Sequence, residues 1–170
     1  MVNNSGRTHS GGYPAIVVPE VYLPRILAID YGRKRIGLAL SDELGLTAQP
    51  LSMLVRKNRR DDLRRLREIC RQHEVGRIVV GYPLHMTGEA GEMAEEAKRF
   101  AARLERELRL EVVLVDERLT SWEAEQLMAT ANSKSRRKDK HHDDVAAAVL
   151  LRDYLNQARG ESLDSSAHKE

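Results

Sequence analysis

The sequence predicts one α/β domain on a five-stranded mixed sheet, with three antiparallel strands followed by two parallel ones and helices on both faces. Three observations predict it. The chain has 170 residues, strand-like patterns give way to helical spacing after residue 55, and short apolar runs alternate with the later helical stripes. We expect residues 25–158 to form the domain, residues 1–24 an N-terminal extension that is partly disordered, and residues 159–170 a disordered tail.

The first three strands are expected to form an antiparallel meander. An apolar run over residues 26–29 ends at Asp30, Gly32 permits a tight turn, and residues 36–40 return as the second strand. Residues 44–55 are predicted to form a third strand at the sheet's edge, because Pro50 inside them cannot donate to a neighbour.

Helices and buried strands then alternate. Apolar residues at helical spacing predict helices over residues 61–74 and 93–108, and a capping box at Thr120-Ser-Trp-Glu123 predicts another to about residue 131. Residues 77–81 form a short buried strand, and residues 111–116 are apolar on both faces, as a central parallel strand would be. A final helix is predicted over residues 143–157. This order is that of the ribonuclease H-like arrangement.

Composition narrows the class of protein. The formal net charge is only +2, so overall charge does not indicate a nucleic-acid binder. The single Cys70 is expected to be a free buried thiol, which suits a reducing cytoplasm. We find neither a signal-like N-terminus nor an apolar run near the ~20 residues of a membrane helix, and therefore expect a cytoplasmic protein without membrane contact.

Acidic residues from three distant segments are expected to meet at one edge of the sheet. Asp30 ends the first strand, Asp116 and Glu117 end the fifth, and Asp143 or Asp144 begins the last helix, where helical spacing does not choose between them. Such acids can also cap turns or stabilise helix dipoles. Gathered carboxylates repel one another unless cations neutralise them, and oxygen ligands suit Mg²⁺ or Mn²⁺. Two such ions can promote phosphodiester hydrolysis.

Four segments carry a resemblance to a known family. They are Leu27-Ala-Ile-Asp30-Tyr-Gly-Arg-Lys-Arg-Ile-Gly37, Val80-Gly-Tyr-Pro-Leu-His-Met-Thr-Gly88, Asp116-Glu-Arg-Leu-Thr-Ser121 with Glu123-Ala-Glu125, and residues 143–154. With these segments the chain resembles the YqgF/RuvX family of bacterial ribonuclease H-like nucleases. The resemblance implies a nuclease that uses one or two Mg²⁺ or Mn²⁺ ions. We favour 5′-end processing of precursor 16S rRNA in ribosome biogenesis, and keep Holliday junction resolution on branched DNA as the alternative.

The resemblance also implies a set of catalytic carboxylates. Asp30 would be the central ligand shared by both metals, and alignment on Tyr154 places the family's aspartate at Asp143. The pair Asp116 and Glu117 would be the second acidic position. Strand alternation points only one of the two into the site, and we favour Glu117 as the ligand beside Asp30 and Asp143. The strand ending at Gly81 offers no fourth acid.

Basic residues near these acids are candidate contacts for substrate phosphates. The predicted set is Arg33, Lys34, Arg35, His85, Arg118, Arg136 and Arg137. Plainer alternatives are an exposed hairpin turn for residues 33–35, an ion pair with a neighbouring acid for Arg118, and a solvated charge run for residues 134–142. The family often has Asn and Asp where this chain has His85 and Thr87, which leaves substrate preference open.

Two other function classes fit parts of the sequence. The Asp30-Tyr-Gly32 turn resembles the phosphate loop of actin-like ATPases, but those proteins need two such domains and this chain supplies one. The second alternative binds structured RNA or DNA without cutting it, as in transcription antitermination. The oligomeric state is left as monomer or homodimer, since a junction resolvase is expected to act as a symmetric pair.

Overall fold

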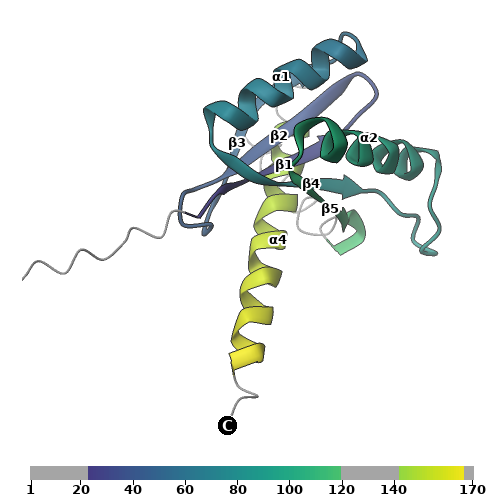
Figure 1. The fold of residues 1–170 in the computed structure, drawn as a ribbon. Coiled ribbons are helices and arrows are strands. Elements are labelled where there is room, and N and C mark those ends of the chain that lie inside the picture. The colour runs from purple at the N-terminus through teal and green to yellow at the C-terminus, as the bar shows by residue number, and fades with distance from the viewer. Residues whose placement is uncertain (1–22, 120–141, 167–170) are drawn as a thin grey trace, which may run out of the picture.

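The computed structural model describes residues 23–119 and 142–166 of the chain. Their strands are β1 (Arg25–Tyr31), β2 (Arg35–Ser41), β3 (Ala48–Val55), β4 (Val75–Tyr82) and β5 (Glu111–Asp116). Their helices are α1 (Arg59–Gln72), α2 (Glu92–Leu108), the short 3₁₀ helix η1 (Glu117–Leu119) and α4 (His142–Ser166). The sheet has the order β3-β2-β1-β4-β5, with β1 in the middle (Figure 1).

Strand pairing gives the mixed sheet that the sequence predicts. β1 pairs with β2 and β2 with β3 in antiparallel fashion, whereas β4 lies parallel to β1 and β5 parallel to β4. Pro50 lies in β3, the edge strand, where its missing N–H costs no ladder bond with a further neighbour. Gly32 makes the turn from β1 to β2 possible, because a Cβ there would collide with the carbonyl oxygen of Arg35.

One prediction about the sheet is wrong. In the described part of the chain β5 pairs with β4 alone, so it is an edge strand and not a central one. Its apolar character has another cause, since both of its faces are partly covered. Val112 packs with the core between the sheet and helices α1 and α2, and Val113 and Val115 pack with the core under α4.

Helices cover both faces of the sheet. On one face α1 and α2 pack over Leu27 and Ile29 of β1, with Leu66 and Leu104 among the buried helix residues. On the other face α4 packs over Ala28 through a buried stripe that includes Leu151. Strand alternation therefore assigns each β1 side chain to one of two cores.

Cys70 lies in the core under α1, and burial raises the pKa of its thiol to about 11, so it is a free structural thiol as expected. None of the helices in the described ranges has both the length and the apolar character needed to cross a bilayer. Helix α4 extends to Ser166, beyond the predicted end at residue 157. The helix predicted over residues 120–131 and most of the basic segment 134–142 lie outside the described residues, and the predicted domain boundaries stay predictions.

The sheet has two distinct ends. The end where β1, β4 and β5 finish is called here the carboxyl edge; β2 starts there, and β3 also ends there because Val55 lies opposite Arg35. At the opposite end, Arg77 near the start of β4 donates a hydrogen bond to the hydroxyl of Tyr154 in α4, with a length of 3.0 Å. From Tyr154 back to its start, α4 spans about 18 Å, close to the ~17 Å of five strand residues. Helix α4 therefore begins toward the carboxyl edge.

Candidate active site

Asp30 lies at the carboxyl edge on the face of the sheet that α4 covers. It is two residues beyond Ala28, which packs against α4, and its own side chain is half-buried. Its partner on β2 is Gly37, and on β4 the pairing of Ile29 with Val80 brings Gly81 level with it. Glycine on both neighbouring strands leaves space around the Asp30 carboxylate.

Glu117 uses this space. It is the first residue of η1, directly after β5, and its side chain lies over Gly81, where any Cβ would overlap its carboxylate. Burial, followed by repulsion from Asp30 and Asp116, raises the pKa of Glu117 to about 7. The structure therefore brings the Asp30 and Glu117 carboxylates together in a half-buried site with excess negative charge.

Asp116 has a different environment. Its carboxylate accepts two hydrogen bonds from the Nε of Arg118, at 3.0 and 2.9 Å, one from Nη2 at 2.6 Å and one from the backbone N–H of that residue at 3.0 Å. Chiefly because of the side-chain hydrogen bonds from Arg118, the pKa of Asp116 lies below its usual value. Of the two adjacent acids, Asp116 is thus neutralised locally, while Glu117 faces Asp30.

The third predicted acid belongs to the start of α4. The helix begins at His142, so the backbone of Asp143 lies in its first turn, toward the carboxyl edge. The side chains of Asp143 and Asp144 lie outside what the structure describes. Among the side chains that are described, no group of three or more His, Cys, Asp and Glu residues is arranged to hold a metal ion. The ligand set thus stays a prediction.

The predicted phosphate contacts fall into three groups. Arg33 is bound to helix α2, with its Nη2 2.8 Å from a carboxylate oxygen of Glu96 and 3.0 Å from one of Glu92. Lys34 and Arg35 are exposed in and beside the β1–β2 turn. Arg136 and Arg137 lie outside the described residues.

His85 lies in the loop between β4 and α2, and Arg118 lies next to this loop. Besides pairing with Asp116, the guanidinium of Arg118 lies 3.5 Å from where a Cβ on Gly88 would be. The exposed ring of His85 packs against Gly91, and the backbone of His85 closes the loop by hydrogen bonds with Glu89 and Gly88. Of the two, Arg118 is the one held next to a predicted catalytic acid.

A cavity of about 510 Å³ lies elsewhere, at the end of the sheet opposite the carboxyl edge. Its lining includes Ile26, Arg77 and Glu111 from the starts of β1, β4 and β5, together with Leu155 and Arg159 of α4. It is remote from the acids that converge at the carboxyl edge. The converging carboxylates, and not this cavity, therefore locate the candidate active site.

Gly37 and Gly81 are site residues that the sequence interpretation misses. Both interrupt strongly apolar strands, and a glycine inside such a strand commonly marks a close approach of another group. Here Gly81 admits the Glu117 side chain, and Gly37 lies directly opposite Asp30. This signal is readable in the sequence, although the approaching group is identified only by the fold.

Replacing Gly81 by alanine should displace the Glu117 carboxylate and reduce the expected nuclease activity by about 10–100-fold, as losing a supporting residue does at the kind of metal site predicted here. The new methyl group would occupy the place of that carboxylate. Cleavage assays and circular dichroism measure activity and folding together. Gly160→Ala is the control, because nothing lies near the Cβ position of that helical glycine. Full activity of Gly81→Ala would contradict a role for Glu117 at this place.

Replacing Glu117 by glutamine should stabilise the metal-free protein at pH 8 by about 1–3 kcal/mol and leave its stability at pH 4 unchanged. The folded-state pKa of about 7 exceeds the ordinary value of 4.5. Below 4.5 both states carry the proton. Above it only the unfolded state releases the proton easily, so the free energy of unfolding of the wild type falls until about pH 7. Urea denaturation in chelator at both pH values measures this, and equal stability of variant and wild type at pH 8 would exclude the raised pKa of Glu117.

Comparisons of the sequence with known proteins identify relatives over most of the chain. The family RuvX, described as Holliday junction resolvase, matches residues 24–157. A relative from Syntrophus aciditrophicus is 43% identical over 143 residues, covering 84% of this chain and 95% of the relative. One from Geobacillus kaustophilus is 45% identical over 137 residues, covering 79% and 99%. Both relatives are named as candidate pre-16S rRNA nucleases.

Solved structures share the fold. RuvC from Thermus thermophilus, known alone and in complex with a Holliday junction substrate, superposes with a TM-score of 0.51 in both cases. The match covers 80% of this chain and 96% of RuvC, at 14% and 15% sequence identity. Likeness at this identity concerns the fold alone, and it confirms the predicted ribonuclease H-like arrangement.

Proposed function

This chain belongs to the RuvX family, and we propose that it is a metal-dependent nuclease that processes the 5′ end of precursor 16S rRNA. The observation that carries the proposal is the convergence of Asp30 and Glu117 in a glycine-lined space at the carboxyl edge. The relatives' names favour precursor rRNA as the substrate. The family's description supports branched DNA as the second candidate.

The residues at the carboxyl edge fit a divalent metal ion. Two carboxylates share a half-buried place where burial, and then repulsion from Asp30 and Asp116, raise the pKa of Glu117. A dication bound between them would remove that repulsion, and oxygen ligands suit Mg²⁺ or Mn²⁺. We assign Asp30 and Glu117 to the ligand set and add Asp143, because α4 begins toward the same edge. When bound, such ions supply activation of the attacking water and stabilisation of the leaving oxygen.

The protein's own residues have separate roles in this proposal. Asp30, on the central strand, is held by neighbours on both sides, so it fixes the position of the site. Gly37 and Gly81 keep the space around it open. Arg118 is oriented by Asp116 and would bind a phosphate of the substrate close to the scissile bond. Asp116 would therefore be a positioning residue and Glu117 a ligand.

A cleavage assay with two substrates tests this function. Precursor 16S rRNA with its 5′ extension and a synthetic four-way DNA junction are offered separately to the purified chain, with Mg²⁺, Mn²⁺ or chelator present. We expect metal-dependent release of the rRNA extension and slower cleavage or none of the junction. Preferred symmetric cleavage of the junction would replace the first assignment by the second. Tight binding of either substrate without metal-dependent cleavage would leave only the non-cleaving function.

A further inference from the structure

The segment that leads into α1 carries much more net positive charge than the rest of the chain. Residues 56–67 contain seven Lys or Arg residues and two Asp residues, whereas the complete chain has a formal net charge of only +2. The remainder of the chain is therefore net acidic. Positive charge gathered on one surface of such a protein attracts anionic ligands to that surface.

This basic segment lies beside the turn that follows Asp30. Arg35 at the start of β2 is paired with Val55 at the end of β3, and the backbone N–H of Arg56 donates to the carbonyl of Lys34 at 3.0 Å. The β1–β2 turn and the chain entering α1 are thus neighbours at the carboxyl edge. Two strand spacings, about 10 Å, separate β3 from β1, which carries Asp30.

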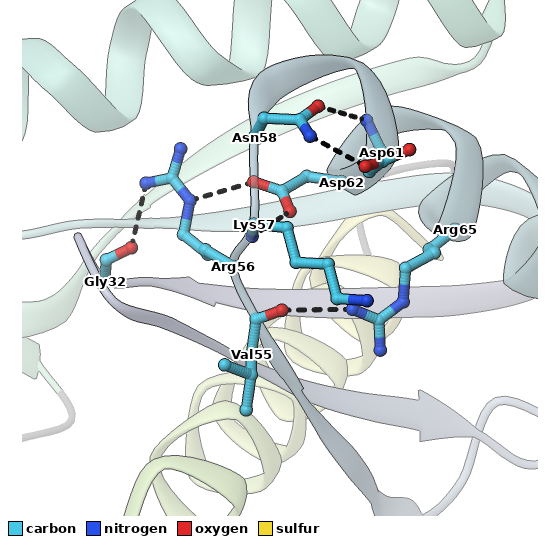
Figure 2. Close-up of polar contacts among 8 residues, drawn as sticks. All are labelled: Gly32, Val55, Arg56, Lys57, Asn58, Asp61, Asp62 and Arg65. Carbon is cyan, nitrogen blue, oxygen red and sulfur yellow. Dashed lines mark hydrogen bonds and ion pairs between the residues drawn. The ribbon is translucent and has the colours of Figure 1, made fainter.

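Arg56 and Asp62 hold the two segments together, as Figure 2 shows. Arg56 donates from Nη1 to the carbonyl of Gly32 at 3.0 Å and from Nε to the buried carboxylate of Asp62 at 3.1 Å. The other oxygen of Asp62 accepts the backbone N–H of Lys57, and Asn58 caps the helix through the N–H of Asp61. The start of α1 is therefore fixed relative to the turn after Asp30.

Four cations on this surface are exposed, and their side chains form no hydrogen bond or ion pair within the described ranges: Lys34, Lys57, Arg59 and Arg60. We call them the α1 basic patch. The predicted phosphate contacts Arg33 and Arg118 differ, because each already binds a carboxylate. Arg64 in the next turn of α1 also has an acidic partner, Asp61, at 3.4 Å. The patch is free to bind an external anion.

Two residues of the patch lie where a positive charge destabilises the helix. Arg59 and Arg60 occupy the first turn of α1, whose partial positive charge makes a cation there unfavourable by a few tenths of a kcal/mol or more. An external phosphate would remove this conflict, because helix N-termini and arginine side chains both favour anions. Asp61 and Asp62 in the same turn offset part of this cost, and the exposed side chains of Arg59 and Arg60, unpaired within the part of the chain that the structure describes, are available to an anion.

We propose that the α1 basic patch binds the phosphate backbone of the nucleic-acid substrate a few nucleotides from the scissile bond. The proposal rests on the proposed nuclease function and adds to it a second contact surface that continues from the carboxyl edge around the β1–β2 turn. The patch lies beyond the β1–β2 turn, on the side of the sheet that α1 covers, so its contacts are with phosphates that are not next to the scissile bond. Because only phosphates are contacted, the patch adds affinity without base specificity.

The test compares two double variants that lose the same charge. Lys57→Gln/Arg60→Gln removes half of the patch, and Arg71→Gln/Arg109→Gln removes two exposed cations near the C-terminal ends of α1 and α2. Binding is measured by fluorescence anisotropy across salt concentrations, in the Asp30→Asn background so that cleavage does not interfere. We expect the patch variant to bind about 10–50-fold more weakly at 0.1 M salt, with a salt slope shallower by about 1.4–1.8.

Kinetics and substrate length provide the second measurement. With an intact Asp30, the patch variant should raise KM and leave kcat unchanged, and a substrate cut back to two nucleotides on either side of the scissile bond should show no difference. Equal salt slopes for the two double variants would overturn the proposal even if cleavage proceeds. Failure of the nuclease function would look different, since the wild type would then bind through the patch without cutting.

Discussion

Replacing Asp30 by asparagine should abolish cleavage, by more than the 10–100-fold that loss of a supporting residue at a metal site costs, and leave nucleic-acid affinity within a few-fold. The amide keeps the shape of the side chain but removes the charge that faces Glu117. Binding depends instead on cations that this change does not touch. Cleavage rates and anisotropy on the same precursor rRNA measure the two effects separately.

A second measurement shows whether the loss has the expected cause. Because the Asp30 charge helps to raise the pKa of Glu117, the asparagine variant should lower that pKa from about 7 toward its ordinary value. Carboxyl titration by NMR in chelator follows it directly. Asp42→Asn is a matched control, since Asp42 caps the β2–β3 turn, where its carboxylate binds the N–H groups of Leu46 and Thr47. Substantial cleavage by the Asp30 variant would end the nuclease assignment.

The sheet could be predicted because each strand carries its own pattern. In β1 alternate residues pack into opposite cores, and the long apolar stripe of α2 is unambiguous. The position of β5 could not be predicted in this way, since partial cover from both faces imitates the pattern of a central strand. Apolar periodicity reports burial, and it does not report how many neighbours a strand has.

The acids at the carboxyl edge were predictable to different degrees. Strand alternation through Val113 and Val115 continues to Glu117, and this agrees with its position near Asp30. The role of Glu117 as a ligand stays a prediction. The partners of Arg33 could not be found from sequence, because Glu92 and Glu96 are remote in the chain and are brought close only by the packing of α2.

Of the α1 basic patch, only Lys34 is predicted from the sequence as a phosphate contact, because the periodicity of residues 61–74 indicates the apolar stripe of the helix and not its cations. Leu63, Leu66 and Cys70 identify the buried face of the helix, and their spacing does not report on the cations among residues 56–60, which precede them. Whether the cations among those residues are paired depends on contacts such as that of Arg56 with Asp62, six residues apart. The fold therefore distinguishes cations that are paired within the protein from cations that can bind a ligand, and composition alone does not.

Replacing Asp62 by alanine should lower the free energy of unfolding by about 2–4 kcal/mol, somewhat less than the loss of one partner from a fully buried ion pair, because Arg56 is partly exposed. The Asp62 side chain is 2% exposed, and its loss would leave the Arg56 guanidinium and the Lys57 N–H without their acceptor. Arg56 also lies 4.8 Å from the ring centre of Tyr31, which packs on Phe100, so the disturbance would reach the core. Urea denaturation at pH 7 measures the loss.

Asp61→Ala is the matched control, one residue earlier in the same helix turn. Asp61 is more exposed and pairs with Arg64 at 3.4 Å, so its removal should cost less than about 1 kcal/mol, several-fold less than removal of Asp62. Similar losses for both variants would mean that the Arg56–Asp62 pair does not fix α1 to the turn after Asp30. If the pair does fix it, Asp62→Asn, which retains an acceptor for the Lys57 N–H, should lose less stability than Asp62→Ala and still weaken substrate binding. That result would mean that the charge of Asp62 holds α1 to the turn after Asp30, and that a neutral amide does not supply this attraction.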